Sequence, residues 1–336
     1  MEHAEQNVAA RRPPGVRFLV PVILVAGVVV LAVLLWLVLR LARPQEPFID
    51  LSSGSAVATP AEVVVEPAPD VLRFAVATMW SLDSTFVMYK PLVEHIAHAV
   101  GREETLLLRT SYAGLRQALE RRGVDVAFIC TGPYVCAFPS GQIKLLVQPE
   151  FAEGVAYQSI VIARREKFPE AIRSLEDLRD LVVGFSDPES FTGRFVLCAK
   201  LFEQGLDPET FFRGRVWTGS HDRSIRAVES GLVDVAPVHS VVWHSALKET
   251  PARRDRLIEI WQSDVFGPPP VVVRSDLSDE LQGALRKAFL TLHETAEGRV
   301  LLSAVGIARF TEGRAEDYRT AMEVCERFKA GMGRKP

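Results

Sequence analysis

Apolar residues follow three different patterns along this chain. Residues 18–39 form one unbroken apolar run without a charged residue. Residues 44–70 are rich in Pro, Ser, Ala and acidic residues and show no periodicity. From Val71 onward, short β-type apolar runs alternate with segments whose apolar residues recur at helical spacing. This alternation predicts an α/β domain built on parallel sheets, with helices on both faces.

The first apolar run is long enough to cross a bilayer as a helix. A secretory signal has a shorter apolar core and a small-x-small cleavage site, whereas this run leads into Arg40 and Arg43. We therefore predict a cytoplasmic N-terminus (1–17), an uncleaved transmembrane signal-anchor (18–42) and a flexible linker (43–70). The domain would lie in the periplasm, held at the inner membrane by a single pass. A cleaved signal is the alternative. Separately, the arginines on the two sides of the run favour a cytoplasmic N-terminus only weakly.

Two stretches of the domain share one plan. Residues 121–135 (RRGVDVAFICTGPYV) and 229–243 (ESGLVDVAPVHSVVW) each run from a helix end at Gly through a "VDVA" strand into a polar turn. Repetition of an α/β unit predicts two similar lobes. Extended segments at 156–165 and 267–277 would form two hinge crossings between them.

These features predict a two-lobed clamshell over residues 71–336. Lobe 1 would take residues 71–157 and 270–336, and lobe 2 residues 158–269. The helical patterns from about Asp279 to Phe328 are predicted to pack back on lobe 1.

The net charge and the cysteine content argue against several classes of function. The net charge is −3 over 336 residues, and no basic cluster suited to nucleic acid is present. The four cysteines match no zinc spacing and are too few for a disulfide scaffold: Cys130, Cys136, Cys198 and Cys325. Metal motifs and nucleotide-binding loops are also missing, so no cofactor is expected.

Polar, hydroxyl-rich turns follow the predicted strands and open the next helices. The clearest is "SDPESFTGR" (186–194), which places Ser190 and Thr192 at a helix start. The corresponding residues of the other turns are Ser84, Tyr112, Thr131, His221 and His239. Each alone is an ordinary N-cap. Because ligands of α/β sheets lie at the carboxyl ends of strands, the set predicts a cleft that holds an oxyanion through helix N-termini.

The order and spacing of several segments resemble a known family. "VDVAFICTGPYV", "SDPESFTG", "TGSHDRSIRAVESGLVDVAPVHS" and "GRVLLSAVGIARF" resemble the phosphonate/phosphite/phosphate-type substrate-binding proteins of ABC transporters, which are type 2 periplasmic binding proteins. In that family a Ser-Thr-Ser-Gly type helix start, a Tyr and a His hold the phosphorus group. The resemblance therefore implies these binding residues: Ser190, Thr192, Gly193, Tyr112, Tyr134 and His221.

Two positions depart from the family pattern. Phe191 stands where the helix start has its middle hydroxyl, which removes a donor and adds bulk. Acidic residues that would bind an aminoalkyl group are not clearly placed, so a small bare oxyanion is favoured over an aminoalkyl phosphonate. Cys130 ends a strand at the cleft, and "FICTGPYV" also resembles arsenite-sensing relatives that work with histidine kinases. A buried inert thiol and a disulfide between Cys130 and Cys136 are the other interpretations.

The favoured function is a tethered binding protein that closes on a small oxyanion and presents it to an ABC permease. A sensor that reports to a histidine kinase is the main alternative. An enzyme would use Ser190 or Cys130 as nucleophile and His221 as base, but no third orienting group is evident. A scaffold whose cleft has lost its ligand is a further hypothesis.

Overall fold

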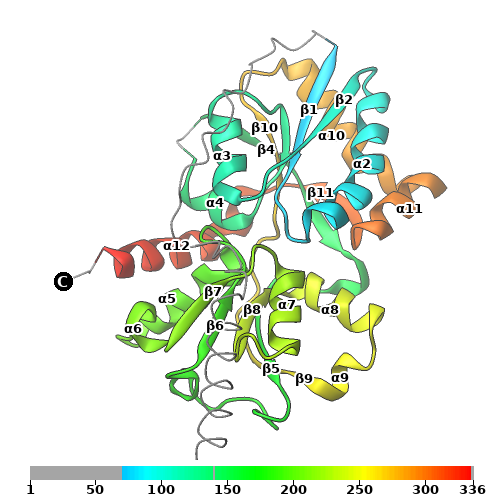
Figure 1. Cartoon of the computed structure of the whole chain (residues 1–336). Coiled ribbons are helices and arrows are strands. Elements are labelled where there is room, and N and C mark those ends of the chain that lie inside the picture. The colour runs from blue at the N-terminus through cyan, green and yellow to red at the C-terminus, as the bar shows by residue number, and fades with distance from the viewer. Residues whose placement is uncertain (1–69, 139–140, 334–336) are drawn as a thin grey trace, which may run out of the picture. The chain divides into compact units, whose positions relative to one another are not determined.

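Residues 70–138 and 141–333 are described by a computed structural model (Figure 1). The predicted cytoplasmic segment, signal-anchor and most of the linker lie outside the described residues. Within the described part, no helix is long and apolar enough to cross a membrane.

The described residues form two sheets, one in each lobe. The sheet of lobe 1 has the strand order β11-β4-β10-β3-β1-β2. Its strands are β1 (Val71–Val76), β2 (Glu103–Leu108), β3 (Val126–Phe128), β4 (Ile143–Phe151), β10 (Val271–Arg274) and β11 (Ile307–Glu312). The sheet of lobe 2 has the order β7-β6-β8-β5-β9. Its strands are β5 (Ser159–Arg164), β6 (Val182–Phe185), β7 (Gly214–Trp217), β8 (Val235–His239) and β9 (Leu257–Gln262).

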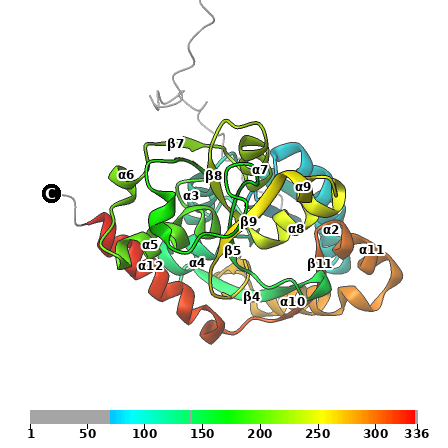
Figure 2. The same ribbon diagram turned by 90° about the horizontal axis from the view of Figure 1, so that it is seen from below.

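Helices cover both sheets, as the alternating pattern predicts (Figure 2). Lobe 1 carries α2 (Leu82–Ala99), α3 (Tyr112–Glu120), α4 (Thr131–Cys136), α10 (Asp279–Thr291) and α11 (Ala296–Ala304). Lobe 2 carries the π-helical turn η3 (Phe191–Phe195), α5 (Val196–Glu203), α6 (Pro208–Phe211), α7 (His221–Glu229), α8 (Ser240–Glu249) and α9 (Arg253–Arg256). The C-terminal helix is α12 (Arg319–Met332).

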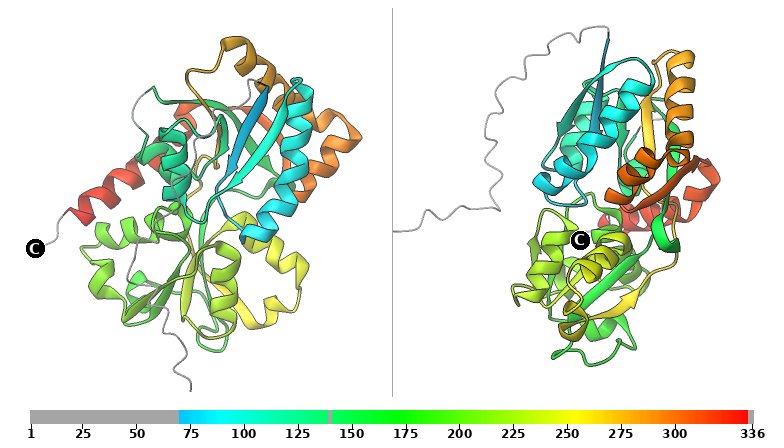
Figure 3. Two further views of the ribbon diagram at one scale, coloured as in Figure 1. Left: turned by 45° about the horizontal axis from the view of Figure 1, so that its top comes forward. Right: turned by 90° about the vertical axis from the view of Figure 1, so that its right-hand side faces the viewer.

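The sheets are mixed rather than wholly parallel, which corrects the prediction. β10 is antiparallel to β3 and β4, and β5 is antiparallel to β8 and β9. The cause is the double crossing between lobes, from β4 to β5 and from β9 to β10 (Figure 3). A strand that enters a lobe from the crossing must run away from the cleft, whereas β1, β3, β6 and β8 run towards it.

The core is continuous between the lobes. One cluster of buried apolar side chains joins the lobe 1 sheet to η3 and α5 of lobe 2. In addition, Trp80 extends from the turn after β1 into the apolar cluster of lobe 2, where it joins Ile160 and Val228. The backbone N–H of His221 donates to the carbonyl oxygen of Met79 at 3.0 Å. The two lobes are therefore closed on each other.

The C-terminal segment corrects a second prediction. α10 and α11 pack on lobe 1, as expected. α12, drawn in red, instead runs along the junction of the lobes and contacts both α4 and α5 (Figures 1 and 3).

Candidate functional site

The turn after β6 builds the centre of the candidate site. Ser190 has extended backbone angles, and its Oγ accepts the N–H of Gly193 at 3.1 Å. This is the side-chain bond of an N-cap, and it opens η3. The Oγ of Ser190 also lies 3.5 Å from Nε2 of His221. A π-helical turn of this kind is frequent at functional sites.

Gly193 is required here because nothing larger fits. A Cβ atom at this position would lie 1.9 Å from Oγ of Ser186, 2.7 Å from Oγ of Ser190 and 2.8 Å from Cε1 of His221. The backbone of Gly193 therefore lies closer to three polar side chains than a residue with a Cβ atom could. We refer to the region around Ser186, Ser190, Thr192, Gly193 and His221 as the seat.

Two buried histidines meet at the seat with defined proton positions. Nδ1 of His221 accepts the backbone N–H of His239 at 3.2 Å, and Nδ1 of His239 accepts the N–H of Val241 at 3.1 Å. A neutral ring that accepts at Nδ1 carries its proton on Nε2. Burial lowers the pKa of His221 to about 4 and lowers the pKa of His239 well below its usual value. Both side chains are therefore neutral Nε2–H donors near pH 7.

Several polar atoms around the seat have no hydrogen-bond partner. Among the described residues, buried unpartnered atoms include Oη of Tyr157, Oγ of Ser186, Oγ1 of Thr192 and Nε2 of His239. The ring of Tyr157 lies 4.7 Å from that of His239. Each such group costs about 1–3 kcal/mol when it stays unpaired. Four of them around one backbone turn indicate a place where a polar ligand or water belongs.

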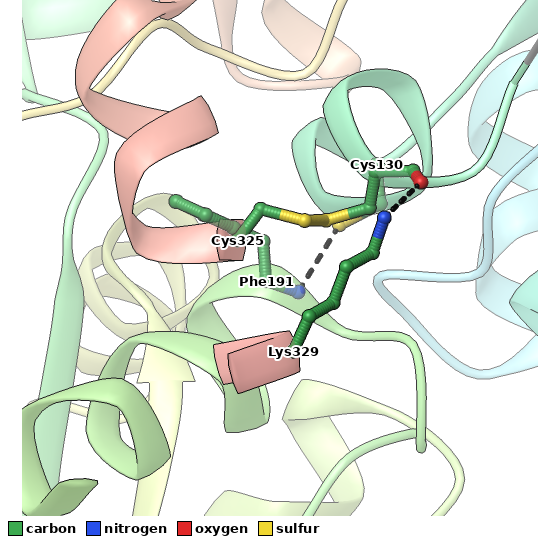
Figure 4. Close-up of a disulfide and its surroundings, with 5 residues drawn as sticks. Cys130, Phe191, Cys325 and Lys329 are labelled. Carbon is green, nitrogen blue, oxygen red and sulfur yellow. Dashed lines mark hydrogen bonds between the residues drawn. A yellow bond between two sulfur atoms is a disulfide. The ribbon is translucent and has the colours of Figure 1, made fainter. Parts of the chain in front are cut away.

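Lobe 1 contributes thiol and backbone groups from the opposite side. Sγ of Cys130 accepts the N–H of Phe191 at 3.5 Å, as the dashed line in Figure 4 shows. The N–H of Tyr112 donates to Oδ2 of Asp187 at 3.3 Å. Burial raises the pKa of Cys130 to about 11, so the side chain is a thiol at neutral pH.

An ion pair at the edge of the cleft also joins the lobes. Nη2 of Arg116 in α3 lies 3.1 Å from Oε1 of Glu189, and both side chains are partly exposed. Contacts of this kind form only when the lobes are closed.

The structure brings most of the predicted residues together. Around the seat lie Ser190, Thr192, Gly193, His221, His239, Cys130 and Tyr112. Thr131 lies next to them, and its Oγ1 donates to the carbonyl oxygen of Gly267 in the second crossing at 3.1 Å.

Two predicted residues lie elsewhere. The ring of Tyr134 packs against Tyr318 at 4.8 Å, on the side of η5 (Ala315–Tyr318) and α12. Ser84 accepts a hydrogen bond from Ser81 in the first turn of α2 and is half-buried. Neither has a hydrogen bond to the seat among the described contacts.

Besides Ser186, Tyr157 was not predicted from the sequence to be a site residue. It lies on the first crossing, just before β5, and it is 2% exposed. Burial raises its pKa well above the usual value, and the neighbouring Cys130, Thr131 and Thr192 also affect it. In the sequence, Tyr157 is an aromatic residue at the start of the extended segment 156–165. In a segment with a strand pattern, such a residue is expected to lie in the core.

The ring of Phe191 packs against the two chain segments that cross between the lobes. Its ring lies 4.9 Å from that of Phe266 and stacks at 6.3 Å on that of Tyr157. Both neighbours belong to segments that join the lobes. Phe191 therefore fills the core of the hinge region while its backbone N–H bonds to Cys130.

The predicted alternative of a disulfide between Cys130 and Cys136 is wrong. Cys136 is bonded to Cys325, and Cys130 and Cys198 are free and buried. The reason is local, because Cys130 precedes α4 and Cys136 ends it. Six residues of helix separate their Cα atoms by about 9 Å, beyond the roughly 7 Å that a disulfide can bridge.

No group of three or more His, Cys, Asp or Glu side chains within residues 70–138 and 141–333 could hold a metal ion.

Comparison with known proteins agrees with this architecture. Residues 74–318 match a family described as the periplasmic substrate-binding protein of phosphonate ABC transporters. The chain belongs to this family. Two curated relatives are the phosphonates-binding periplasmic protein of Escherichia coli K12, 24% identical over 78% of each chain, and the phosphate-import protein PhnD of Mycolicibacterium smegmatis, 22% identical over 71% of this chain and 77% of the relative.

Solved structures of the family share the two-lobed fold. PhnD1 of Prochlorococcus marinus, in complex with methylphosphonate, superimposes with a TM-score of 0.70 at 18% identity, over 78% of this chain and 99% of that chain. A binding protein of a Pseudomonas aeruginosa phosphonate transporter also gives 0.70, at 22% identity, over 78% and 87%. The predicted fold of type 2 periplasmic binding proteins is thereby confirmed for the two-sheet domain.

Proposed function

We propose that this chain is the receptor of an ABC transporter and that its seat binds a small phosphorus oxyanion. The observation that carries the proposal is the set of buried, unpartnered polar atoms around the start of η3. Membership of the substrate-binding family and the names of the relatives support the same ligand class.

The donors at the seat are neutral. Hydroxyls of Ser190, Thr192 and Tyr157 and the Nε2–H groups of the two histidines can all donate to a bound group. The backbone N–H groups of Phe191 and Gly193 are already bonded to Cys130 and Ser190. Hydrogen bonds from such donors to a charged acceptor are roughly twice as strong as those between neutral groups. The carboxylate of Asp187, which accepts the N–H groups of Glu189 and Tyr112, opposes an anion nearby, so the preference rests on the number of donors that surround the seat. The seat therefore suits a bare oxyanion better than a ligand with an ammonium group.

The protonation of His221 disfavours an enzyme. A general base for Ser190 needs a lone pair on the nitrogen that faces it. Here Nδ1 of His221 already accepts the N–H of His239, which leaves the proton on Nε2, the nitrogen that faces Ser190. The arrangement donates to a bound group and does not activate a nucleophile.

Cys130 does not offer a preformed thiolate to arsenite, and its neighbour in the sequence, Cys136, is not free to supply a second thiol. The pKa of the Cys130 thiol is raised to about 11 by burial, and its Sγ accepts the N–H of Phe191. Cys136 is held in a disulfide with Cys325. We therefore favour the transport partner, a permease of the inner membrane, over a sensor kinase.

We further propose that residues 18–42 tether this domain to the inner membrane, on its extracytoplasmic side. The support is the uncharged apolar run together with the flanking arginines. A flexible linker of the length of residues 43–70 would span roughly 30 Å, which keeps the domain close to a permease in the same membrane.

A ligand panel tests the proposed function. The full chain in detergent micelles is heated with phosphate, phosphite, methylphosphonate or sulfate at several concentrations. A ligand that binds only the folded state raises the melting temperature, and the shift grows with concentration. We expect at least one of the three phosphorus oxyanions to stabilise the protein more than sulfate does. Equal melting temperatures with and without every phosphorus oxyanion would contradict the proposal.

A further inference from the structure

The C-terminal helix α12 is tied covalently to lobe 1. Cys325 of α12 is joined by a disulfide to Cys136, the last residue of α4. Figure 4 shows this disulfide with Lys329, one turn further along α12, whose Nζ donates to the carbonyl oxygen of Cys136 at 2.7 Å. The link joins residues 189 positions apart in the sequence. α12 therefore cannot leave α4 while the disulfide is intact.

The same helix packs against lobe 2. The ring of Phe328 stacks on that of Phe195 at 4.2 Å, with an angle of 21° between their planes. Nη1 of Arg327 lies 2.7 Å from Oε1 of Glu203 in α5. α5 and α12 lie side by side in Figure 2, in agreement with these contacts. One helix is thus attached to both lobes, in addition to the two chain crossings.

The contacts that α12 makes with lobe 2 lie directly next to the seat. Phe195 ends η3, two residues after Gly193. Between them, the guanidinium of Arg194 lies over the ring of Phe328 at 5.0 Å and over that of Trp217 at 5.2 Å. Movement of α12 relative to lobe 2 must therefore act on the turn that carries the candidate ligand donors.

We propose that α12 and its disulfide form a strap that holds the two lobes closed. Opening separates Phe191 from Cys130 and Tyr112 from Asp187, so lobe 2 moves away from α4. With the disulfide intact, α12 stays on α4, and opening must unstack Phe328 from Phe195. Without it, α12 can leave α4 and move with lobe 2. The strap thus biases the protein towards the closed state, whatever its ligand.

Amide hydrogen exchange of the full chain, followed by mass spectrometry, tests the strap without any ligand. The variant is the double substitution Cys136→Ser and Cys325→Ser. We expect the cleft segments 112–116 and 186–195 to exchange roughly tenfold faster in the variant, since an aromatic pair such as Phe195–Phe328 is worth about that factor. The sheet strands β1 and β8 lie within single lobes and serve as the control, with unchanged exchange.

Reduction of the natural protein provides a second, matched measurement. The two thiols of dithiothreitol are oxidised to its cyclic disulfide while the Cys136–Cys325 bond becomes two thiols. Exchange in the cleft segments should then rise to the rate of the variant, and dithiothreitol should leave the variant unchanged. If the variant fails to fold, reduction of the natural protein still tests whether the disulfide restrains opening.

Four results would overturn the proposal. Unchanged exchange in the cleft segments would show that the disulfide does not restrain opening. Equal acceleration in β1 and β8 would show a general loss of stability. Faster exchange of the variant in dithiothreitol would show that the reductant acts on something other than this disulfide. Peptide mapping that finds no Cys136–Cys325 link would show that the strap does not exist.

Discussion

The backbone N–H of His239 donates to Nδ1 of His221 across 3.2 Å, which joins the end of β8 to the start of α7. The bond requires a lone pair on Nδ1, so His221 cannot become doubly protonated without breaking it. The ring lies 5.8 Å from that of His239, which is also buried and neutral. Protonation of either side chain would place a charge next to the other and disrupt the seat.

We predict that stability falls as the pH drops below about 6.5. The pKa of His221 is about 4 in the folded protein, lowered by burial, so the unfolded chain binds the extra proton first. Stability from this group is complete above pH 6.5 and is lost between 6.5 and 4, by roughly 3 kcal/mol. The raised pKa of Asp187, caused by burial, opposes the loss at the acid end.

The measurement is urea denaturation at pH 7.5, 6.5, 5.5 and 5.0. His221→Asn keeps an acceptor near the position of Nδ1 and removes the titrating group, so its stability should depend less steeply on pH. The same slope in both proteins would show that His221 does not titrate in this window.

We predict that Ser190→Ala and Thr192→Val each weaken binding of the phosphorus oxyanion by about 1–3 kcal/mol, because a hydrogen bond to a buried charge is lost. Titration calorimetry with the oxyanion that gives the largest thermal shift measures the change. Ser278→Ala is the matched control, since its Oγ caps α10 by accepting the N–H of Leu281. The control should lose about 1 kcal/mol of stability and bind normally. Normal affinity in both seat variants would place the ligand elsewhere.

We predict opposite effects for two Gly→Ala substitutions. At Gly193 the new Cβ meets Oγ of Ser186 at 1.9 Å, so Gly193→Ala should lower stability by about 1–3 kcal/mol and abolish oxyanion binding. At Gly283, within α10, no atom lies within 4 Å of the new Cβ. Gly283→Ala should therefore raise stability by about 0.5–1 kcal/mol and leave binding intact. Thermal melts with and without ligand compare the two, and tight binding by Gly193→Ala would contradict the seat.

The fold class and most residues of the seat could be predicted from the sequence. Alternating strand and helix patterns and the two "VDVA" units predicted the two-sheet α/β domain, because period and turn residues act locally. Ser190, His221 and His239 were predicted as site residues because each directly follows a strand or opens a helix, and such positions meet at the cleft. Tyr157 escaped because it lies on a crossing, where no periodic pattern distinguishes a cleft residue from a core residue.

The partners of the cysteines could not be read from the chain. Cys136 and Cys130 are close in sequence, yet helix geometry separates them, and Cys325 reaches Cys136 only because α12 folds back across the lobes. The position of Tyr134 has the same origin, since its ring faces Tyr318 from the other end of the sequence.

By itself, the sequence determined the alternation of strands and helices, the family resemblance and the polar turns at strand ends, since these depend on residues near one another in the chain. Only the tertiary structure decided the antiparallel strands, the disulfide between α4 and α12, and which polar atoms remain without partners. These features depend on contacts between segments far apart in the sequence, and such contacts exist only after the two lobes have packed and closed.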